Sequence, residues 1–223
     1  MLILLLGMSL GLQAQSDGGK SKIRMGIHAM PNVSFLSTTD EDLDTKSKLK
    51  FGFGLITEFN FADNYSFLTG VDYVMRGGEF TKDFDQAVMP GVSDTITELN
   101  AAFIQIPLML KMRTKQFGYM KYFAEFGGIA AFRAKEELIF KPKKVESDVN
   151  DNYVAFADFI FSVGLGAEYH LGGQTYLLLG VYYNHSLSDI LKKDKAQDAN
   201  KLWDVEKYNY RFNYVGLKVG VLF

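Results

Sequence analysis

The stretch LKFGFGLITEFNF, residues 49–61, alternates large apolar residues with small or polar ones. Six positions share one face of an extended chain: Phe51, Phe53, Leu55, Thr57, Phe59 and Phe61. The opposite face collects glycine and polar residues: Gly52, Gly54, Glu58 and Asn60. A period of two residues indicates a β-strand whose faces meet different surroundings. The stretch FIFSVGLGAEYH, residues 159–170, repeats the pattern and predicts a second strand of the same kind.

Six further segments alternate less regularly but also predict strands. They are residues 23–36, 65–77, 98–114, 120–134, 175–188 and 207–223. Many exceed ten residues, whereas strands of soluble sheets average about 5–6. Tilted strands that cross a bilayer need about 9–11 residues, and their hairpins often project beyond it. The lengths therefore favour a sheet that spans a membrane.

The connections between these segments alternate strictly between short and long. The short ones are residues 62–64, 115–119 and 171–174, and the long, polar ones are 37–48, 78–97, 135–154 and 189–206. In an up-and-down meander this places every long loop on one rim and every short turn on the other, as in outer-membrane barrels. We therefore predict an all-β fold over residues 23–223, an eight-stranded antiparallel up-and-down transmembrane β-barrel.

A soluble eight-stranded barrel, such as a lipocalin, is the main structural alternative. The split between a bulky face and a face of glycine and charge favours the membrane barrel, because it fits a narrow lumen. The last strand agrees with this, since it ends in an aromatic residue and has one apolar face: Val215, Leu217, Val219, Val221 and Phe223. Aromatic residues near strand ends predict an interfacial girdle: Tyr65, Phe67, Tyr119, Tyr122, Tyr208 and Tyr210.

The N-terminus has the shape of a secretory signal. An apolar run over residues 2–12 is too short to span a bilayer as a helix, and Gln13, Ala14 and Gln15 follow it. No Lys or Arg precedes the run, and a buried N-terminal strand or helix is the alternative. We predict a signal peptide over residues 1–14, cleaved near Ala14, a short periplasmic segment over 15–22, and an integral outer-membrane location.

Composition narrows the classes of function. The net charge of −2 and the isoelectric point of about 5.9 offer no basic surplus for a nucleic acid. The absence of cysteine excludes disulfides, Cys-ligated zinc, a thiol nucleophile and a lipid-modified cysteine.

The face predicted to line the lumen carries charges of both signs. They are Glu58, Asp72, Lys111, Arg113, Glu125, Arg133, Glu168 and Lys218, together with His28. Eight strands enclose a lumen that side chains fill, and buried charges need partners. We therefore predict a structural charge network of Glu58, Asp72, Lys111, Glu125, Arg133, Glu168 and Lys218. A proton or ion pathway, or an acid/base site, is the alternative.

Positions within the predicted strands add detail to this network. Counted from the short-turn rim, five charges lie at comparable depth: Glu58, Lys111, Glu125, Glu168 and Lys218. Lys111 and Glu125 are also at similar distances from the turn at 115–119, so they should face each other across a hairpin.

Other constellations carry weaker signals. The three histidines, His28, His170 and His185, show no metal-ligand spacing. His185-Ser186 could be half of a hydrolase site. The acidic cluster of Asp40, Glu41, Asp42 and Asp44 could hold a divalent cation, and Lys141, Lys143 and Lys144 could meet lipid phosphates, although solvated loops explain both. The glycine pairs at 52/54 and 164/166 lack the remainder of a dinucleotide motif, so we expect no cofactor.

The segment FIQIPLMLK, residues 103–111, carries the most specific family signal, supported by the closing VGLKVGVLF, residues 215–223, and by the glycine-rich strand after Leu49. With these pieces the chain resembles the PorT-like outer-membrane β-barrel family of Bacteroidota over nearly its whole mature length. The namesake of that family serves type IX secretion, but the motif indicates a fold rather than an activity. Within it, Pro107 predicts a bulge or local break, because proline cannot donate to the ladder.

Together these features predict a non-enzymatic barrel with a structural or protein-interaction role through its long extracellular loops. The expected partners are outer-membrane lipid, lipopolysaccharide and other envelope proteins. An outer-membrane enzyme acting on lipid A or peptide and a soluble lipocalin-like carrier of an apolar ligand are the alternatives.

Overall fold

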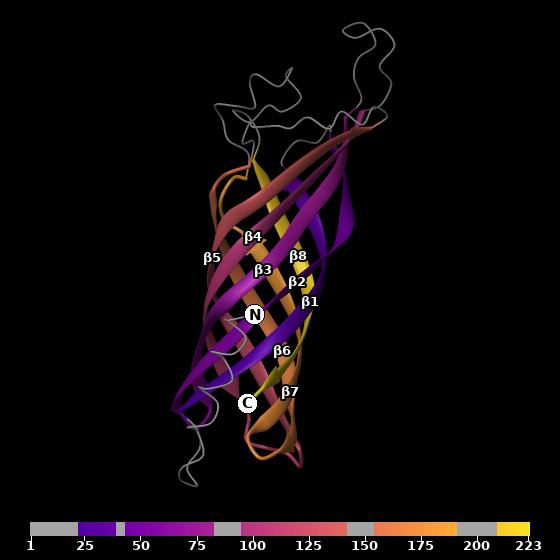
Figure 1. Cartoon of the computed structure of the whole chain (residues 1–223). Helices are drawn as coiled ribbons and strands as arrows, with labels where there is room; N and C mark the ends of the chain where they lie inside the picture. The colour runs from indigo at the N-terminus through magenta and orange to yellow at the C-terminus, as the bar shows by residue number, and fades with distance from the viewer. Residues whose placement is uncertain (1–21, 39–42, 83–94, 142–153, 191–208) are drawn as a thin grey trace, which may run out of the picture.

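The computed structural model describes residues 22–38, 43–82, 95–141, 154–190 and 209–223. They form eight antiparallel strands in a closed barrel with the order β1 to β8, and β8 pairs back onto β1 (Figure 1). The strands are β1 Ile23–Thr38, β2 Leu43–Ala62, β3 Tyr65–Lys82, β4 Thr95–Arg113, β5 Met120–Lys141, β6 Ala157–Gly172, β7 Thr175–Ser186 and β8 Tyr210–Leu222. The predicted up-and-down barrel is confirmed. No helix among the described residues is long and apolar enough to cross a membrane.

Most strands are longer than the sequence pattern predicts, above all β2, β3 and β5. β2 to β5 have 18–22 residues, and their pairing continues to Leu43↔Lys82, Lys82↔Thr95 and Ile96↔Lys141. The predicted loops 37–48, 78–97 and 135–154 are therefore too long. Backbone hydrogen bonds continue the ladder after the apolar alternation has ended, because pairing does not require a buried face. β7 and β8 have only 12 and 13 residues, so one half of the barrel rises above the other (Figure 1).

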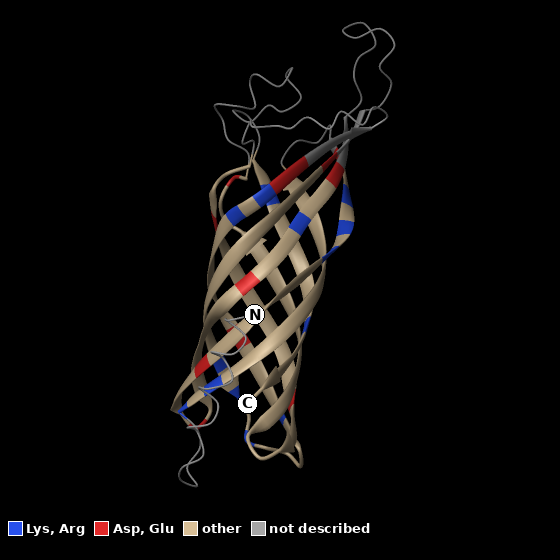
Figure 2. Ribbon diagram, in the orientation of Figure 1, with Lys and Arg blue, Asp and Glu red and all other residues tan. Residues whose placement is uncertain are grey.

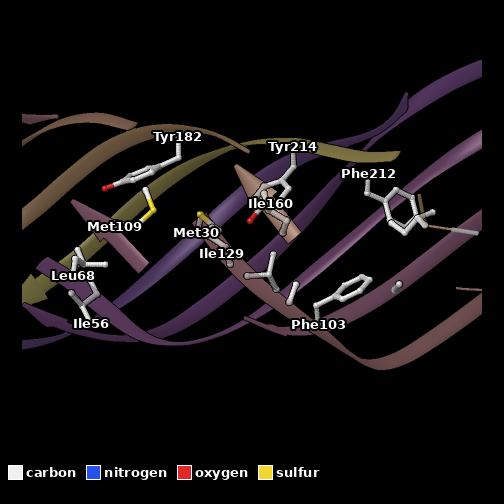
Figure 3. Close-up of a cluster of buried hydrophobic side chains, with 14 of the residues drawn as sticks. Met30, Ile56, Leu68, Phe103, Met109, Ile129, Ile160, Tyr182, Phe212 and Tyr214 are labelled. Atoms are coloured by element: carbon white, nitrogen blue, oxygen red, sulfur yellow. The ribbon is translucent and has the colours of Figure 1, made fainter. Parts of the chain in front are cut away.

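The two faces of the wall follow the alternation. Between Leu49 and Phe61 every second residue of β2 points outward, and all of these except Thr57 are exposed apolar side chains. The inward face is less uniformly small and charged than predicted, because it also holds an apolar core (Figure 3). That core contains Met30, Ile56, Leu68, Phe103, Met109, Ile129, Ile160 and Phe212. The lumen is thus packed with side chains, as a barrel of this size requires.

Inward glycines make room for their long neighbours. A Cβ on Gly164 would lie 2.4 Å from the ring of Tyr182, and one on Gly54 would lie 2.0 Å from Oδ1 of Asp72. Each long side chain therefore leans across a strand position that has no side chain. This explains why glycine alternates with bulky residues along the decisive strands.

Pro107 interrupts one ladder without shifting it. On the β3 side the pairs Thr69↔Leu108 and Asp72↔Gln105 keep one register, and the ladder is broken between them. The predicted local break is present, but a bulge at Pro107 is wrong. The register shift of β4 lies instead between Ala102 and Phe103, on the β5 side.

The predicted girdle is only partly correct. Tyr65, Tyr119 and Tyr122 are exposed on the outside near the short turns. Tyr210 is buried because it shares the inward face of β8 with Phe212. Tyr208 and the predicted signal peptide lie outside the described residues, so these two predictions stay predictions.

Candidate functional site

The end of the lumen near the short turns, which is the lower end in Figure 1, contains a network of ion pairs centred on Lys111 of β4. Its Nζ lies 2.5 Å from a carboxylate oxygen of Glu58, 2.6 Å from one of Glu168 and 3.3 Å from one of Glu125. The side chains of Lys111 and these three glutamates are completely buried. Lys111 therefore neutralises charges contributed by β2, β5 and β6 at one point.

Two arginines complete the network. Arg24 of β1 bridges Glu58 and Glu168, with Nη2 3.0 Å from Glu168, and Arg113 lies 3.3 Å from Glu58. Three cations thus face three carboxylates, and hydrogen bonds to charged groups are the strong ones. Because each charge has an opposite partner, the burial of all six is tolerated.

The register explains why these residues meet. Arg24 is the direct cross-strand partner of Glu58, and Lys111 that of Glu125. Directly opposite residues on one face lie within reach of each other's side chains. The remaining contacts cross the lumen, which the closure of the barrel makes narrow.

Three residues predicted for the network lie elsewhere. Lys218 is one inward position nearer the long connections than Glu168, because Leu178, the partner of Glu168, pairs with Gly220. It is one inward position nearer the short turns than the row of Glu125, which runs through Tyr182 to Gly216. Its Nζ stands 4.1 Å from the centre of the Tyr182 ring. Lys218 is therefore at a depth comparable to that of the network, as predicted, but among the described residues no ion pair joins it to Glu58, Glu125 or Glu168.

Asp72 and Arg133 also lie apart from the lower network. Asp72 approaches His28, with 3.6 Å between Oδ1 and Nε2. Arg133 pairs with Glu136 near the end of β5 that bears the long connection. The predicted set is therefore spread over several levels of the lumen.

Sequence reasoning missed Arg24 and an upper pair, Arg76 with Asp158. Arg76 Nη1 lies 2.7 Å from Asp158 Oδ2, both side chains are buried, and Ser186 Oγ donates to the other Asp158 oxygen at 2.7 Å. The alternation could have placed both arginines in the lumen. Arg24 is an even number of positions from the inward His28, and Arg76 is an even number of positions from the inward Asp72.

The wall around β2, β3 and β4 carries a further charge cluster where it extends above the shorter strands (Figure 2). Lys48 Nζ lies 2.7 Å from Glu79 and 3.4 Å from Glu98. The hydrogen bond to Glu79 raises the pKa of Lys48 above its ordinary value. Burial acts to raise the pKa of Glu98, but its hydrogen bond from Asn100 and the charge of Lys48 outweigh this and hold it below the ordinary value.

Other predicted constellations do not assemble within the described residues. Ser186 is buried in the lumen while His185 stacks on Tyr183, because neighbours on a strand point to opposite faces. No group of three potential metal ligands occurs among the described side chains. Residues 40–42 and the side chains at 141, 143 and 144 lie outside the part that the structure describes.

A closed eight-stranded barrel that is apolar outside and filled with paired charges and apolar side chains inside defines a transmembrane β-barrel of the outer-membrane type. Residues 13–192 match the family model described as outer membrane protein beta-barrel domain. The chain belongs to this family, and its integral outer-membrane location follows from that membership.

Several solved structures match the chain at low sequence identity. Neisserial surface protein A matches with 12% identity over 92% of this chain and 97% of its own, with a TM-score of 0.45. Ail, the attachment invasion locus protein of Yersinia pestis, matches with 11% identity, 91% and 100% coverage and a TM-score of 0.39. OprG from Pseudomonas aeruginosa matches with 13% identity, 92% and 98% coverage and a TM-score of 0.40. No curated protein matches the chain.

Proposed function

We propose that the protein is a non-enzymatic, PorT-like outer-membrane barrel that acts through its rim as a structural or protein-interaction module. One observation carries this proposal. The lumen is occupied along its length by buried side chains, from Arg24 and Lys111 at one end to Arg76 and Phe212 at the other. A barrel filled in this way offers no path for diffusion, so transport is not its function.

The use of the wall supports the same conclusion. Its outer face carries apolar side chains suited to lipid, and its inner face fills the lumen. The rim with the long connections is then the surface available for recognition. Next to that rim the extended β2–β5 wall is held together by ion pairs of Lys48 with the buried Glu79 and with Glu98. This wall can therefore support the connections that meet a polar partner such as an envelope protein or a lipopolysaccharide headgroup.

The alternatives fit the geometry less well. A lipocalin-like carrier needs an open lumen and a polar exterior, whereas the described residues fill the lumen and make the exterior apolar. An outer-membrane esterase or protease needs a nucleophile beside a base, but Ser186 and His185 point to opposite sides of the wall.

The first experiment tests location and barrel integrity. The protein should stay in the membrane fraction after alkaline carbonate extraction and should migrate faster on gels unboiled than boiled. Recovery in the soluble fraction would contradict the proposal.

The second experiment tests where the function lies. Shortened variants of the connections at 142–153 and 191–208 should remain heat-modifiable but lose the proteins that co-purify with the full chain in mild detergent. A variant shortened in the turn at 115–119 serves as the matched control and should retain them. If shortening both long connections leaves the co-purified proteins unchanged, recognition occurs elsewhere on the barrel.

A further inference from the structure

The middle of the lumen holds buried polar side chains that neither ion-pair network includes. They belong to one row of cross-strand partners, in which His28 of β1, Gly54 of β2, Asp72 of β3 and Gln105 of β4 follow each other around the wall. Gly220 of β8 continues the row on the other side of His28. His28, Asp72 and Gln105 are each more than nine-tenths buried.

Polar atoms of this row lack hydrogen bonds. They are both ring nitrogens of His28, Oδ1 of Asp72 and Nε2 of Gln105. The distance of 3.6 Å between His28 Nε2 and Asp72 Oδ1 is too long for a direct hydrogen bond. The other side-chain atom of Gln105, Oε1, accepts a hydrogen bond from the Tyr214 hydroxyl at 3.0 Å, which fixes the amide in place. Because buried polar groups are almost always hydrogen-bonded, these atoms point to a common ligand.

Glycine keeps the space between them. Gly54 lies between His28 and Asp72 in the row, and a Cβ there would be 2.0 Å from Asp72 Oδ1. A Cβ on Gly220 would be 2.9 Å from Cβ of His28. The row therefore holds its polar groups close together without joining them.

The charges decide the class of ligand. The lower and middle lumen contains four buried cations, Arg24, Lys111, Arg113 and Lys218, and four buried carboxylates, Glu58, Glu125, Glu168 and Asp72. Above them, Arg76 pairs with Asp158. The partly buried Lys121 lies outside this set and donates to the Tyr176 hydroxyl at 3.2 Å. The buried set itself therefore leaves no net charge for a bound ion to neutralise. A ligand for Asp72 Oδ1 must donate, whereas one for Gln105 Nε2 must accept, and water does both.

We propose that His28, Asp72 and Gln105 form a buried site for a small cluster of ordered water molecules. The water bridges the His28 ring to the Asp72 carboxylate and the Gln105 amide. Through the hydrogen bond of Gln105 to Tyr214, the cluster connects the middle of the lumen to the level of Arg76, whose guanidinium lies 6.0 Å from the centre of the Tyr214 ring. The lumen is then closed to diffusion but internally hydrated.

The test uses the full-length barrel refolded in lipid and crystallised from a lipidic phase. We expect water density within hydrogen-bond distance of His28 and Asp72, and long-lived water contacts to the His28 ring by nuclear Overhauser measurements in nanodiscs. Gly54→Ala should displace the Asp72 carboxylate and remove at least one of these waters. Gly128→Ala is the matched control, because a Cβ there has no neighbour within 4 Å, and it should leave the waters in place.

Two results would overturn the proposal. One is a dry site in which His28 and Asp72 bond directly to each other, and the other is density with the coordination of an ion. Both readouts come from the unaltered protein, so they decide the question even if Gly54→Ala fails to fold. In that case Gln105→Leu provides the second variant, and it should lose the water that bonds to the amide.

Discussion

Lys111 and Glu125 lie directly opposite each other on the β4–β5 hairpin, with 3.3 Å between Nζ and a carboxylate oxygen. The equal spacing of the two residues from the turn at 115–119 predicts this pairing. The structure adds that Lys111 also contacts Glu58 and Glu168, so one lysine compensates three carboxylates. The consequences of removing either partner are therefore unequal.

Replacing the lysine should be the more damaging change. Lys111→Met leaves three buried carboxylates with only Arg24 and Arg113, and should cost about 3–5 kcal/mol of unfolding free energy. Glu125→Gln should cost less, because Lys111 keeps two partners. The double variant should recover part of the loss of Lys111→Met. Urea unfolding in lipid vesicles measures this, and equal losses in all three variants would contradict a network centred on Lys111.

The packing of Tyr182 against Gly164 should be sensitive to one methyl group. A Cβ at Gly164 would lie 2.4 Å from the ring, whose hydroxyl donates to Glu125 at 2.8 Å. Gly164→Ala should therefore destabilise the barrel by about 1–3 kcal/mol through overpacking. Gly128→Ala, with no neighbour near its Cβ, should change the same unfolding midpoint little. A similar shift in both variants would mean that strand flexibility matters here, not contact with Tyr182.

A charge introduced on the lipid-facing side of β2 should destabilise the barrel more the deeper it lies in the bilayer. Leu55 lies in the middle of the outward apolar run of β2, and Leu49 lies at its upper end. Leu55→Arg should cost about 2–4 kcal/mol when the barrel is folded in lipid, and Leu49→Arg about 0–1 kcal/mol. Equal costs in vesicles would show that β2 does not cross the bilayer at this depth.

The Lys48–Glu79–Glu98 cluster should give the barrel a defined response to pH. The pKa of Glu98 is held below its ordinary value of 4.5, so its stabilising effect is present above pH 4.5 and is lost as the pH falls through the folded pKa. The pKa of Lys48 is raised above 10.5, so its effect is present below that pH and is lost as the pH rises through the folded pKa.

Glu98→Gln tests the loss of stability at acid pH. It should flatten the fall in unfolding midpoint below pH 4.5, whereas Glu137→Gln, at an exposed position of β5, should leave the fall unchanged. The expected difference is small because the cluster is partly exposed to solvent, and it should shrink further in high salt. If the unfolding midpoint of Glu98→Gln falls below pH 4.5 as it does in the unaltered protein, the ion pair of Lys48 and Glu98 makes no contribution.

The N-terminal prediction has a direct test. If residues 1–14 are a signal peptide, the protein purified from outer membranes should begin at Gln15 by mass spectrometry. An intact residue 1 in that fraction would contradict cleavage.

Much of the fold could be predicted because its signals are local. Side chains on a strand alternate whatever the strand pairs with, so residues 49–61 and 159–170 disclose which face meets lipid and which meets the lumen. The ends of β2 to β5 could not be predicted in this way. Their upper parts pair through the backbone ladder and through charged side chains, and Leu43↔Lys82 leaves no apolar periodicity to detect.

By itself the sequence determined the number of strands, their antiparallel order, the rims on which short and long connections lie, and the inward position of Glu58, Lys111, Glu125 and Glu168. Each follows from periodicity and the length of connections. Apart from the hairpin pair of Lys111 and Glu125, only the tertiary structure decided which charges meet. Arg24 and Glu168 are 144 positions apart, and they bond because closure of the barrel brings β1 and β6 to opposite sides of one narrow lumen. The stagger of the strands then sets which side chains reach each other, so Arg24 joins these ion pairs and Lys218 does not.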